Sequence, residues 1–177
     1  MKYQLKAGIL CQLTDKETLT PIASIKNKLC GAEKKIQVEQ SVYSTQIVSI
    51  ESTQPKPKGS CPHQYLLLDE QQKIILQATP YYAEGEDPSI SGWPLYRMPQ
   101  VELAKLTIDG QTCILQMLNV QNYRLTTNDQ TVLAEVIHRG ISGGWNINTY
   151  AKFSPEILCG LFIFCRYLEQ ESELMAV

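Results

Sequence analysis

The feature that most restricts the fold of this chain is an apolar segment near its C-terminus. Residues 157–165 run without a polar side chain, and Ser154, Pro155 and Glu156 precede them. Ser is a good N-cap, Pro suits the first helical position, and Glu favours the positive end of the helix dipole. We therefore predict a helix over residues 155–169. Because it would be apolar on all sides, we expect protein to surround it. The run is about half of the ~18 residues that a bilayer span needs, so no transmembrane helix is predicted.

The rest of the chain is typical of short β-strands separated by turns. Alternating or β-branched apolar segments occur at residues 10–13, 36–39 and 46–50. Residues 65–78 and 123–136 form a weak repeat, in which an aromatic-led strand, a polar turn and an aliphatic strand follow one another. Residues 106–115 predict a third hairpin, because an Asp-Gly pair lies at the centre of that segment. Repeated hairpins build a meander that closes as a barrel or a sandwich.

An all-β chain with one fully apolar helix predicts a closed antiparallel β-barrel around a buried hydrophobic C-terminal helix. The chain has 177 residues, of which 44% are hydrophobic, so one domain over residues 1–177 is expected. Residues 53–60 hold two prolines and a glycine, and we interpret them as a loop within this domain. A charged fraction of 19% and a net charge of −2 argue against a disordered chain, a coiled coil and a histone-like basic protein.

The charge is distributed unevenly along the chain. Residues 1–58 contain nine Lys and five acidic residues, whereas residues 59–177 contain seven basic and thirteen acidic ones. Six lysines of the first part are candidates for contact with anionic lipid headgroups: Lys26, Lys28, Lys34, Lys35, Lys56 and Lys58. Each lysine near a membrane surface contributes about 1 kcal/mol to binding. The alternative is that they only keep the surface hydrated. Aromatic residues are not interleaved with them, so no nucleic-acid partner is expected.

The chain contains six cysteines: Cys11, Cys30, Cys61, Cys113, Cys159 and Cys165. The N-terminal segment shows no apolar run of signal-peptide length, which favours a reducing cytoplasm and six thiols outside disulfides. Cys159 and Cys165 are six residues apart on the expected helix and would point in different directions as small core residues.

The segment at residues 140–144 fits the pattern G-x-S-x-G and would make Ser142 a nucleophile. A nucleophile elbow needs a strand before the serine, a helix after it and a histidine later in the chain. The two histidines of the chain are His63 and His138, both of which precede Ser142. A glycine-rich hairpin loop is therefore the preferred interpretation, and a serine hydrolase is the least favoured function.

Two further segments contain side chains that can bind cations, and neither is predicted to bind a metal. Cys61 and His63 supply two ligands where a tetrahedral site needs four, or three and water, so we expect a loop cysteine and an exposed histidine. Residues 82–94 are acidic and turn-rich but lack the ligand spacing of an EF-hand loop. No catalytic residue and no cofactor is expected either.

The C-terminal segment and the paired hairpins together resemble the tubby C-terminal superfamily, which includes the LURP-one-related proteins and the phospholipid scramblases. Residues 153–168 resemble the scramblase-like ending, in which a turn containing Phe and Pro leads into a buried helix. The resemblance implies a barrel of about twelve strands. Where scramblases carry acidic residues proposed to bind Ca²⁺, this chain has Asn146 and Asn148, so Ca²⁺ affinity should be poor.

We therefore expect a non-enzymatic binding or scaffold domain that contacts anionic phospholipid headgroups or a membrane surface. The alternative is a cytoplasmic protein–protein adaptor with no lipid role. Both interpretations place the protein in the cytoplasm, and the first also places it at the membrane periphery.

Overall fold

The computed structural model describes residues 1–14, 18–27, 33–50, 56–86, 100–108, 110–119 and 121–173. Lys28, Cys30 and most of the acidic segment 82–94 lie outside these residues. The strands are β1 (Lys2–Lys6), β2 (Ile9–Leu13), β3 (Leu19–Asn27), β4 (Lys34–Val38), β5 (Ser41–Ser49), β6 (His63–Leu68), β7 (Ile74–Tyr82), β8 (Val101–Ile108), β9 (Gln111–Asn119), β10 (Asn122–Thr127), β11 (Val132–His138) and β12 (Trp145–Thr149). A short 3₁₀ helix, η1 (Gly140–Ser142), connects β11 to β12, and α1 (Pro155–Glu173) ends the described chain.

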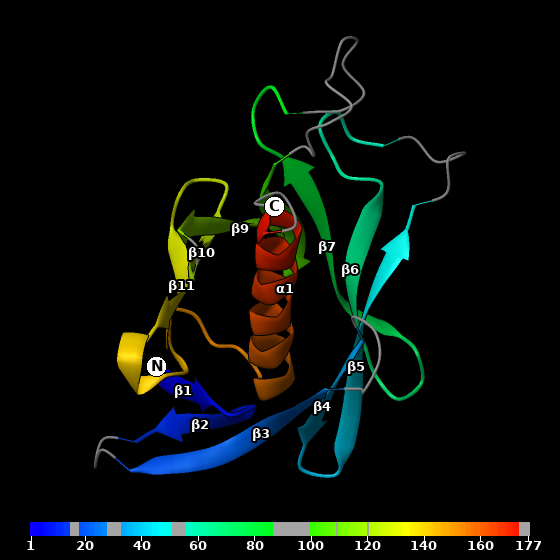
Figure 1. Ribbon diagram of the computed structural model, residues 1–177. Coiled ribbons are helices and arrows are strands. Elements are labelled where there is room, and N and C mark those ends of the chain that lie inside the picture. Colours follow the sequence, from blue (N-terminus) through cyan, green and yellow to red (C-terminus); the bar gives the residue numbers. More distant parts are fainter. Residues whose placement is uncertain are drawn as a thin grey trace.

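The strands form one closed barrel in which each strand pairs antiparallel with its neighbours in the sequence (Figure 1). The barrel closes where β1 pairs with β12, with Tyr3 opposite Ile147. Residues 53–60 lie between two strands that pair directly, since Ser49 of β5 is opposite His63 of β6. The expectation of a closed antiparallel barrel is therefore confirmed.

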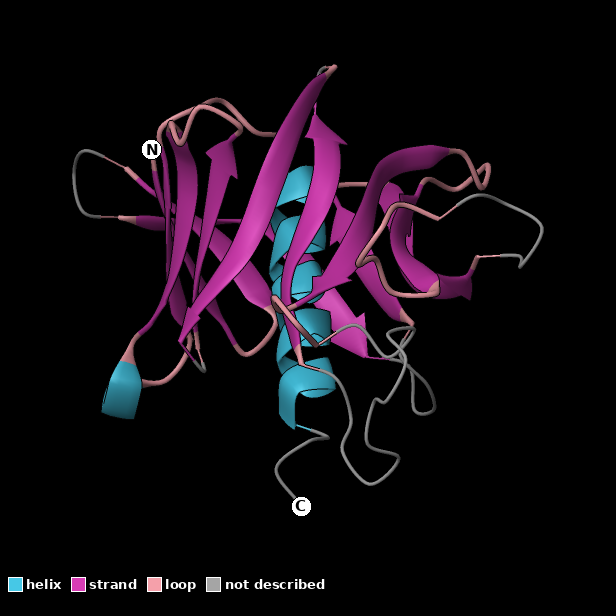
Figure 2. Cartoon of the chain, turned by 90° about the horizontal axis from the view of Figure 1, so that it is seen from above, coloured by secondary structure: helices cyan, strands magenta, loops and turns pink. Residues whose placement is uncertain are grey.

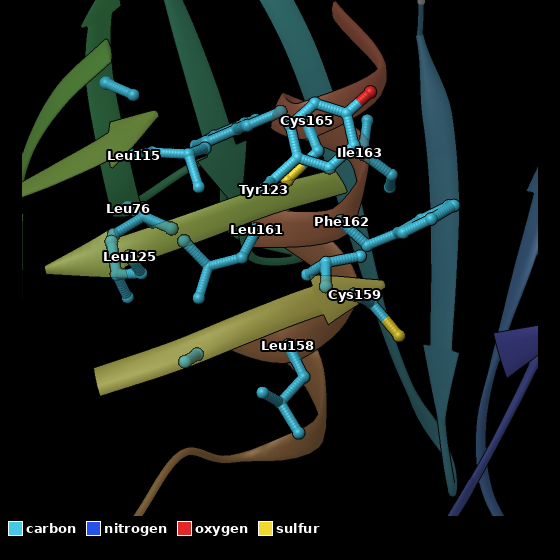
Figure 3. Close-up of a cluster of buried hydrophobic side chains, with 14 of the residues drawn as sticks. Leu76, Leu115, Tyr123, Leu125, Leu158, Cys159, Leu161, Phe162, Ile163 and Cys165 are labelled. Carbon is cyan, nitrogen blue, oxygen red and sulfur yellow. The ribbon is translucent and has the colours of Figure 1, made fainter. Parts of the chain in front are cut away.

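Helix α1 lies inside the ring of strands (Figure 2). Every residue from Leu158 to Cys165 is buried, and so are Tyr167, Leu168 and Glu169. The helix packs its apolar side chains against inward-facing residues of β6, β7, β9 and β10, some of which Figure 3 shows. The structure thus confirms a helix that strands enclose on all sides. It extends four residues beyond the predicted end at residue 169. No helix in the described ranges has the length and apolar character that a bilayer span requires.

The two repeated hairpins have the same local structure. Tyr65 is opposite Ala78 in the β6–β7 pair, and Tyr123 is opposite Val136 in the β10–β11 pair. Each hairpin has a register irregularity two or three residues after its tyrosine. In each turn a glutamine has positive φ, 63° at Gln72 and 67° at Gln130. Both tyrosines are fully buried and pack beside α1, so the sequence repeat reflects two equivalent walls of the core.

The G-x-S-x-G segment is a strand-to-strand connection. Ser142 ends η1 and is exposed, and strand β12 follows it in place of the helix that a nucleophile elbow requires. Gly144 has φ of 80°, and a Cβ atom there would lie 2.5 Å from the carbonyl oxygen of Leu5. The glycine therefore allows the connection to pass close to β1. The connection joins two paired antiparallel strands, β11 and β12, as the hairpin-loop interpretation predicts.

Replacing Gly144 with alanine is expected to lower the free energy of unfolding by about 3 kcal/mol, through left-handed strain and the clash with backbone. The control is Gly110→Ala, because Gly110 has φ of 78° but nothing within 4 Å of its Cβ position. That variant should lose about 1–2 kcal/mol from strain alone. Urea unfolding of both variants measures the difference. Equal losses would show that the close approach to Leu5 costs nothing.

Candidate functional site

A cavity with a volume of about 390 Å³ opens between α1 and the barrel wall. Strands β1, β3, β4 and β12, the β1–β2 turn and the second half of α1 form its lining. The apolar part of the lining consists of Leu5, Ala7, Gly8, Ile25, Trp145, Phe162 and Ile163, and the polar part of Lys34, Arg166, Tyr167 and Gln170. The cavity therefore combines apolar walls with two cationic side chains.

Lys34 reaches the cavity because of the alternation of side chains along β4. Ile36 on the same strand is fully buried, and Lys34 lies on the same face two residues earlier. Lys35 lies on the opposite face and is exposed. Five of the six lysines singled out from the sequence are described, and of these five Lys34 is the one that lines this cavity.

Lys35 is opposite Lys26 of β3 in the antiparallel register, and both side chains are exposed. Like charges directly opposite each other on neighbouring strands repel and destabilise the sheet. An anion bound near this pair would offset the repulsion. The end of the β3–β4 hairpin thus presents two ammonium groups outside the barrel and the Lys34 side chain at the cavity.

Lys56 and Lys58 do not belong to this group. Both are exposed in the connection between β5 and β6. In Figure 1 the described residues of that connection, 56–62, lead into the upper end of β6, well separated from the end of β3. The structure therefore divides the predicted basic surface into a β3–β4 group and a separate pair.

Arg166 is held at the cavity wall by a buried carboxylate and a partly buried aromatic ring. It forms an ion pair with Glu169, and its guanidinium carbon lies 5.5 Å from the centre of the Trp145 ring. Glu169 is only 2% exposed and also accepts a hydrogen bond from the hydroxyl of Tyr123. Burial, and then this hydrogen bond, raise the pKa of Tyr123 above its ordinary value of 10.0. Arg166, Glu169 and Trp145 were not identified from the sequence, because neither their spacing nor their surroundings form a recognisable motif.

A second polar cluster lies where the last turn of α1 meets the start of β6. The ligand atoms of Cys61, His63 and Glu171 all lie within 4.8 Å of one another. His63 Nε2 is 2.8 Å from Glu171 Oε1, and the hydroxyl of Tyr65 donates to the same oxygen at 2.5 Å. Burial, and then the negative charge of Glu171, raise the pKa of Tyr65 above its ordinary value of 10.0.

Cys61 lies in the connection before β6, as the expected loop cysteine does, but the expectation of an exposed histidine is corrected, because His63 belongs to β6 and is half-buried. Cys61 is 1% exposed, and the side chain of His63 is 23% exposed. The cysteine is buried because its backbone N–H donates to the carbonyl of Pro80 at 2.9 Å, which holds the segment against β7. The sequence gives no signal for Glu171 as a third ligand, because it lies 108 positions after His63.

The cysteines and the two asparagines singled out from the sequence remain to be placed in the structure. The five described cysteines, Cys11, Cys61, Cys113, Cys159 and Cys165, form no disulfide with one another. Burial raises the pKa of Cys159 to about 12. Asn146 and Asn148 line a separate cavity together with Lys2, Tyr3, Gln4, Leu13 and Leu19, and none of the described residues of that lining is a carboxylate.

Comparison of the chain with family models, curated proteins and solved structures gives no match. The function is therefore inferred from the charged residues at the cavity and at the end of the β3–β4 hairpin.

Proposed function

We propose that this protein is a non-enzymatic binding domain that recognises anionic phospholipid headgroups through the end of the β3–β4 hairpin and the adjoining cavity. The observation that supports this function is the position of Lys34, which lies beside the apolar walls of the cavity, on a strand whose neighbouring Lys35 faces outward opposite Lys26. A phosphate would meet ammonium groups there, and the apolar part of a lipid would meet the walls.

Electrostatics favour a membrane over a free anion as the source of the phosphate. An anionic membrane attracts basic side chains at long range and needs no enclosed pocket. Lys26 and Lys35 are exposed on the outside of the barrel, where a flat surface can reach them. On this proposal the domain acts in the cytoplasm at the inner surface of a membrane, where anionic lipids are concentrated.

The resemblance to the tubby C-terminal superfamily remains a prediction. Its implied architecture agrees with a barrel around a terminal helix, but agreement in architecture alone does not establish a common family or function. The headgroup proposal therefore depends on the charged residues of this chain.

The test is cosedimentation with vesicles of phosphatidylcholine, with and without phosphatidylserine, over a series of salt concentrations. The double variant Lys26→Gln/Lys35→Gln should lose up to about 2 kcal/mol of binding to the anionic vesicles at low salt. Lys34→Gln should weaken binding further. For the parent protein and for each variant, binding to the anionic vesicles should fall as the salt concentration rises, because salt screens the charges.

The matched control is Lys56→Gln/Lys58→Gln, which removes the same charge from a separate exposed segment. It should lose much less binding than the β3–β4 double variant. Equal losses would indicate attraction to net charge without a defined surface. If the parent protein shows no preference for anionic vesicles even at low salt, the lipid proposal is wrong, and a protein–protein adaptor becomes the better interpretation.

A further inference from the structure

The cluster between the end of α1 and the start of β6 has the composition of a transition-metal site. Cys61, His63 and Glu171 each offer one ligand atom, and these three atoms lie within 4.8 Å of one another. We propose that these residues bind a Zn²⁺ ion, with water as the fourth ligand. The site is distinct from the cavity and from the lysines of the headgroup proposal, so either can hold without the other.

The three ligand types together select the class of metal. A thiolate and an imidazole suit Zn²⁺ and similar ions, whereas Ca²⁺ and Mg²⁺ take oxygen ligands. Three protein ligands with one position left for water is the composition of an open zinc site. His63 and Glu171 have side chains 23% and 19% exposed, so a fourth ligand can come from solvent.

Charge also favours a cation at this point. Glu171 lies in the last turn of α1, where the helix dipole is negative and disfavours a carboxylate, and that turn contains no basic residue. On binding, Cys61 would release its thiol proton to solvent and His63 would bind in its neutral form. One thiolate and one carboxylate would then balance the two charges of Zn²⁺.

Tyr65 is a positioning residue for the site. Its ring is fully buried against Phe164 and Tyr167, with ring centres 5.6 and 5.2 Å away. The fixed hydroxyl donates to Oε1 of Glu171 at 2.5 Å and so orients the carboxylate. Hydrogen-bond donors of this kind orient metal ligands, and losing one typically costs 10–100-fold in affinity.

A bound ion would join two segments that are far apart in the sequence. Cys61 lies just before β6 and His63 begins it, whereas Glu171 lies more than 100 residues later on α1. Zinc would tie the last turn of the helix to the barrel wall and stabilise the folded protein in proportion to its binding.

The test is titration of the metal-free full-length protein with ZnCl₂, followed by bound-metal analysis and thermal unfolding. One Zn²⁺ per chain and a rise in Tm are expected, with no response to CaCl₂. Co²⁺ should give the near-ultraviolet thiolate-to-cobalt absorption band. Cys61→Ser should abolish that band and weaken Zn²⁺ binding roughly 100-fold or more, and Tyr65→Phe should weaken it about 10-fold.

Two control variants match the ligand variants. Cys113→Ser removes an equally buried thiol, 0% exposed against 1% for Cys61, and should leave the cobalt band in place. His138→Gln is the control for His63→Gln. If Cys61→Ser does not fold, His63→Gln and Glu171→Gln change partly exposed side chains and still test the site. Zinc binding that is unchanged in these variants, or absent from the parent protein, would overturn the proposal.

Discussion

Replacing Phe164 with alanine should lower the free energy of unfolding by about 3–5 kcal/mol. Phe164 is 0% exposed and lies in the part of α1 that the barrel encloses, with its ring centre 5.6 Å from that of Tyr65. Its removal would leave a void between the helix and the β6 wall that neighbouring side chains fill only in part. Urea or guanidinium unfolding at equilibrium measures the loss.

Phe162→Ala is the matched comparison for this prediction. Phe162 is 7% exposed, lines the 390 Å³ cavity and meets the edge of Trp145 at 4.9 Å. Truncation there enlarges a space that already exists, so the loss should be smaller than for Phe164. A loss at Phe164 below about 1 kcal/mol would mean that the helix is not enclosed by the strands.

Replacing Glu169 with alanine should cost about 3 kcal/mol, although the residue is charged. The buried carboxylate accepts from the Tyr123 hydroxyl and pairs with Arg166. Its loss would leave a buried hydroxyl without this acceptor, at about 1–3 kcal/mol. It would also remove the counter-charge of Arg166, whose side chain is 33% exposed and therefore partly hydrated, which limits that part of the loss.

Glu156→Ala is the control at the opposite end of α1, where the carboxylate interacts mainly with the helix dipole. It should cost at most about 1 kcal/mol. The double variant Tyr123→Phe/Glu169→Ala should be less destabilised than the sum of its single variants, because the hydroxyl that needs an acceptor is gone. Strict additivity of the two losses would contradict the described network.

The main elements of the fold could be predicted because their signals are local. The apolar run at 157–165 excludes a surface helix whatever its neighbours are, and the repeated hairpins carry their turn chemistry within a few residues. The predicted helix nevertheless ended too early, at residue 169. The structure continues it to Glu173, because backbone hydrogen bonding extends a helix beyond its apolar segment.

The burial of Glu169 could not be predicted from such local signals. A carboxylate is rarely buried unless it is paired. Its partner Tyr123 lies 46 residues earlier in the chain, on another element, and the packing of α1 against β10 brings the two together.

The lysines show the same division between local and tertiary information. The concentration of positive charge in the first part of the chain could be recognised from the sequence. The alternation of side chains along β4 accounts for Lys34 and Lys35 facing opposite ways. Only strand pairing placed Lys26 opposite Lys35, and only the path of the chain put Lys56 and Lys58 elsewhere.

By itself, the sequence determined a barrel around an apolar helix, since burial of that helix and the pairing of the hairpins satisfy every local pattern at once. Tertiary structure alone decided which residues meet at the cavity wall and which meet in the cluster of Cys61, His63 and Glu171. Glu171 meets His63 across 108 positions in the sequence, and Arg166 lies over the Trp145 ring at the cavity wall. Such contacts depend on how far α1 is inserted and how it is rotated inside the barrel. Those two quantities follow from the packing of the whole core, which no short segment of the chain specifies.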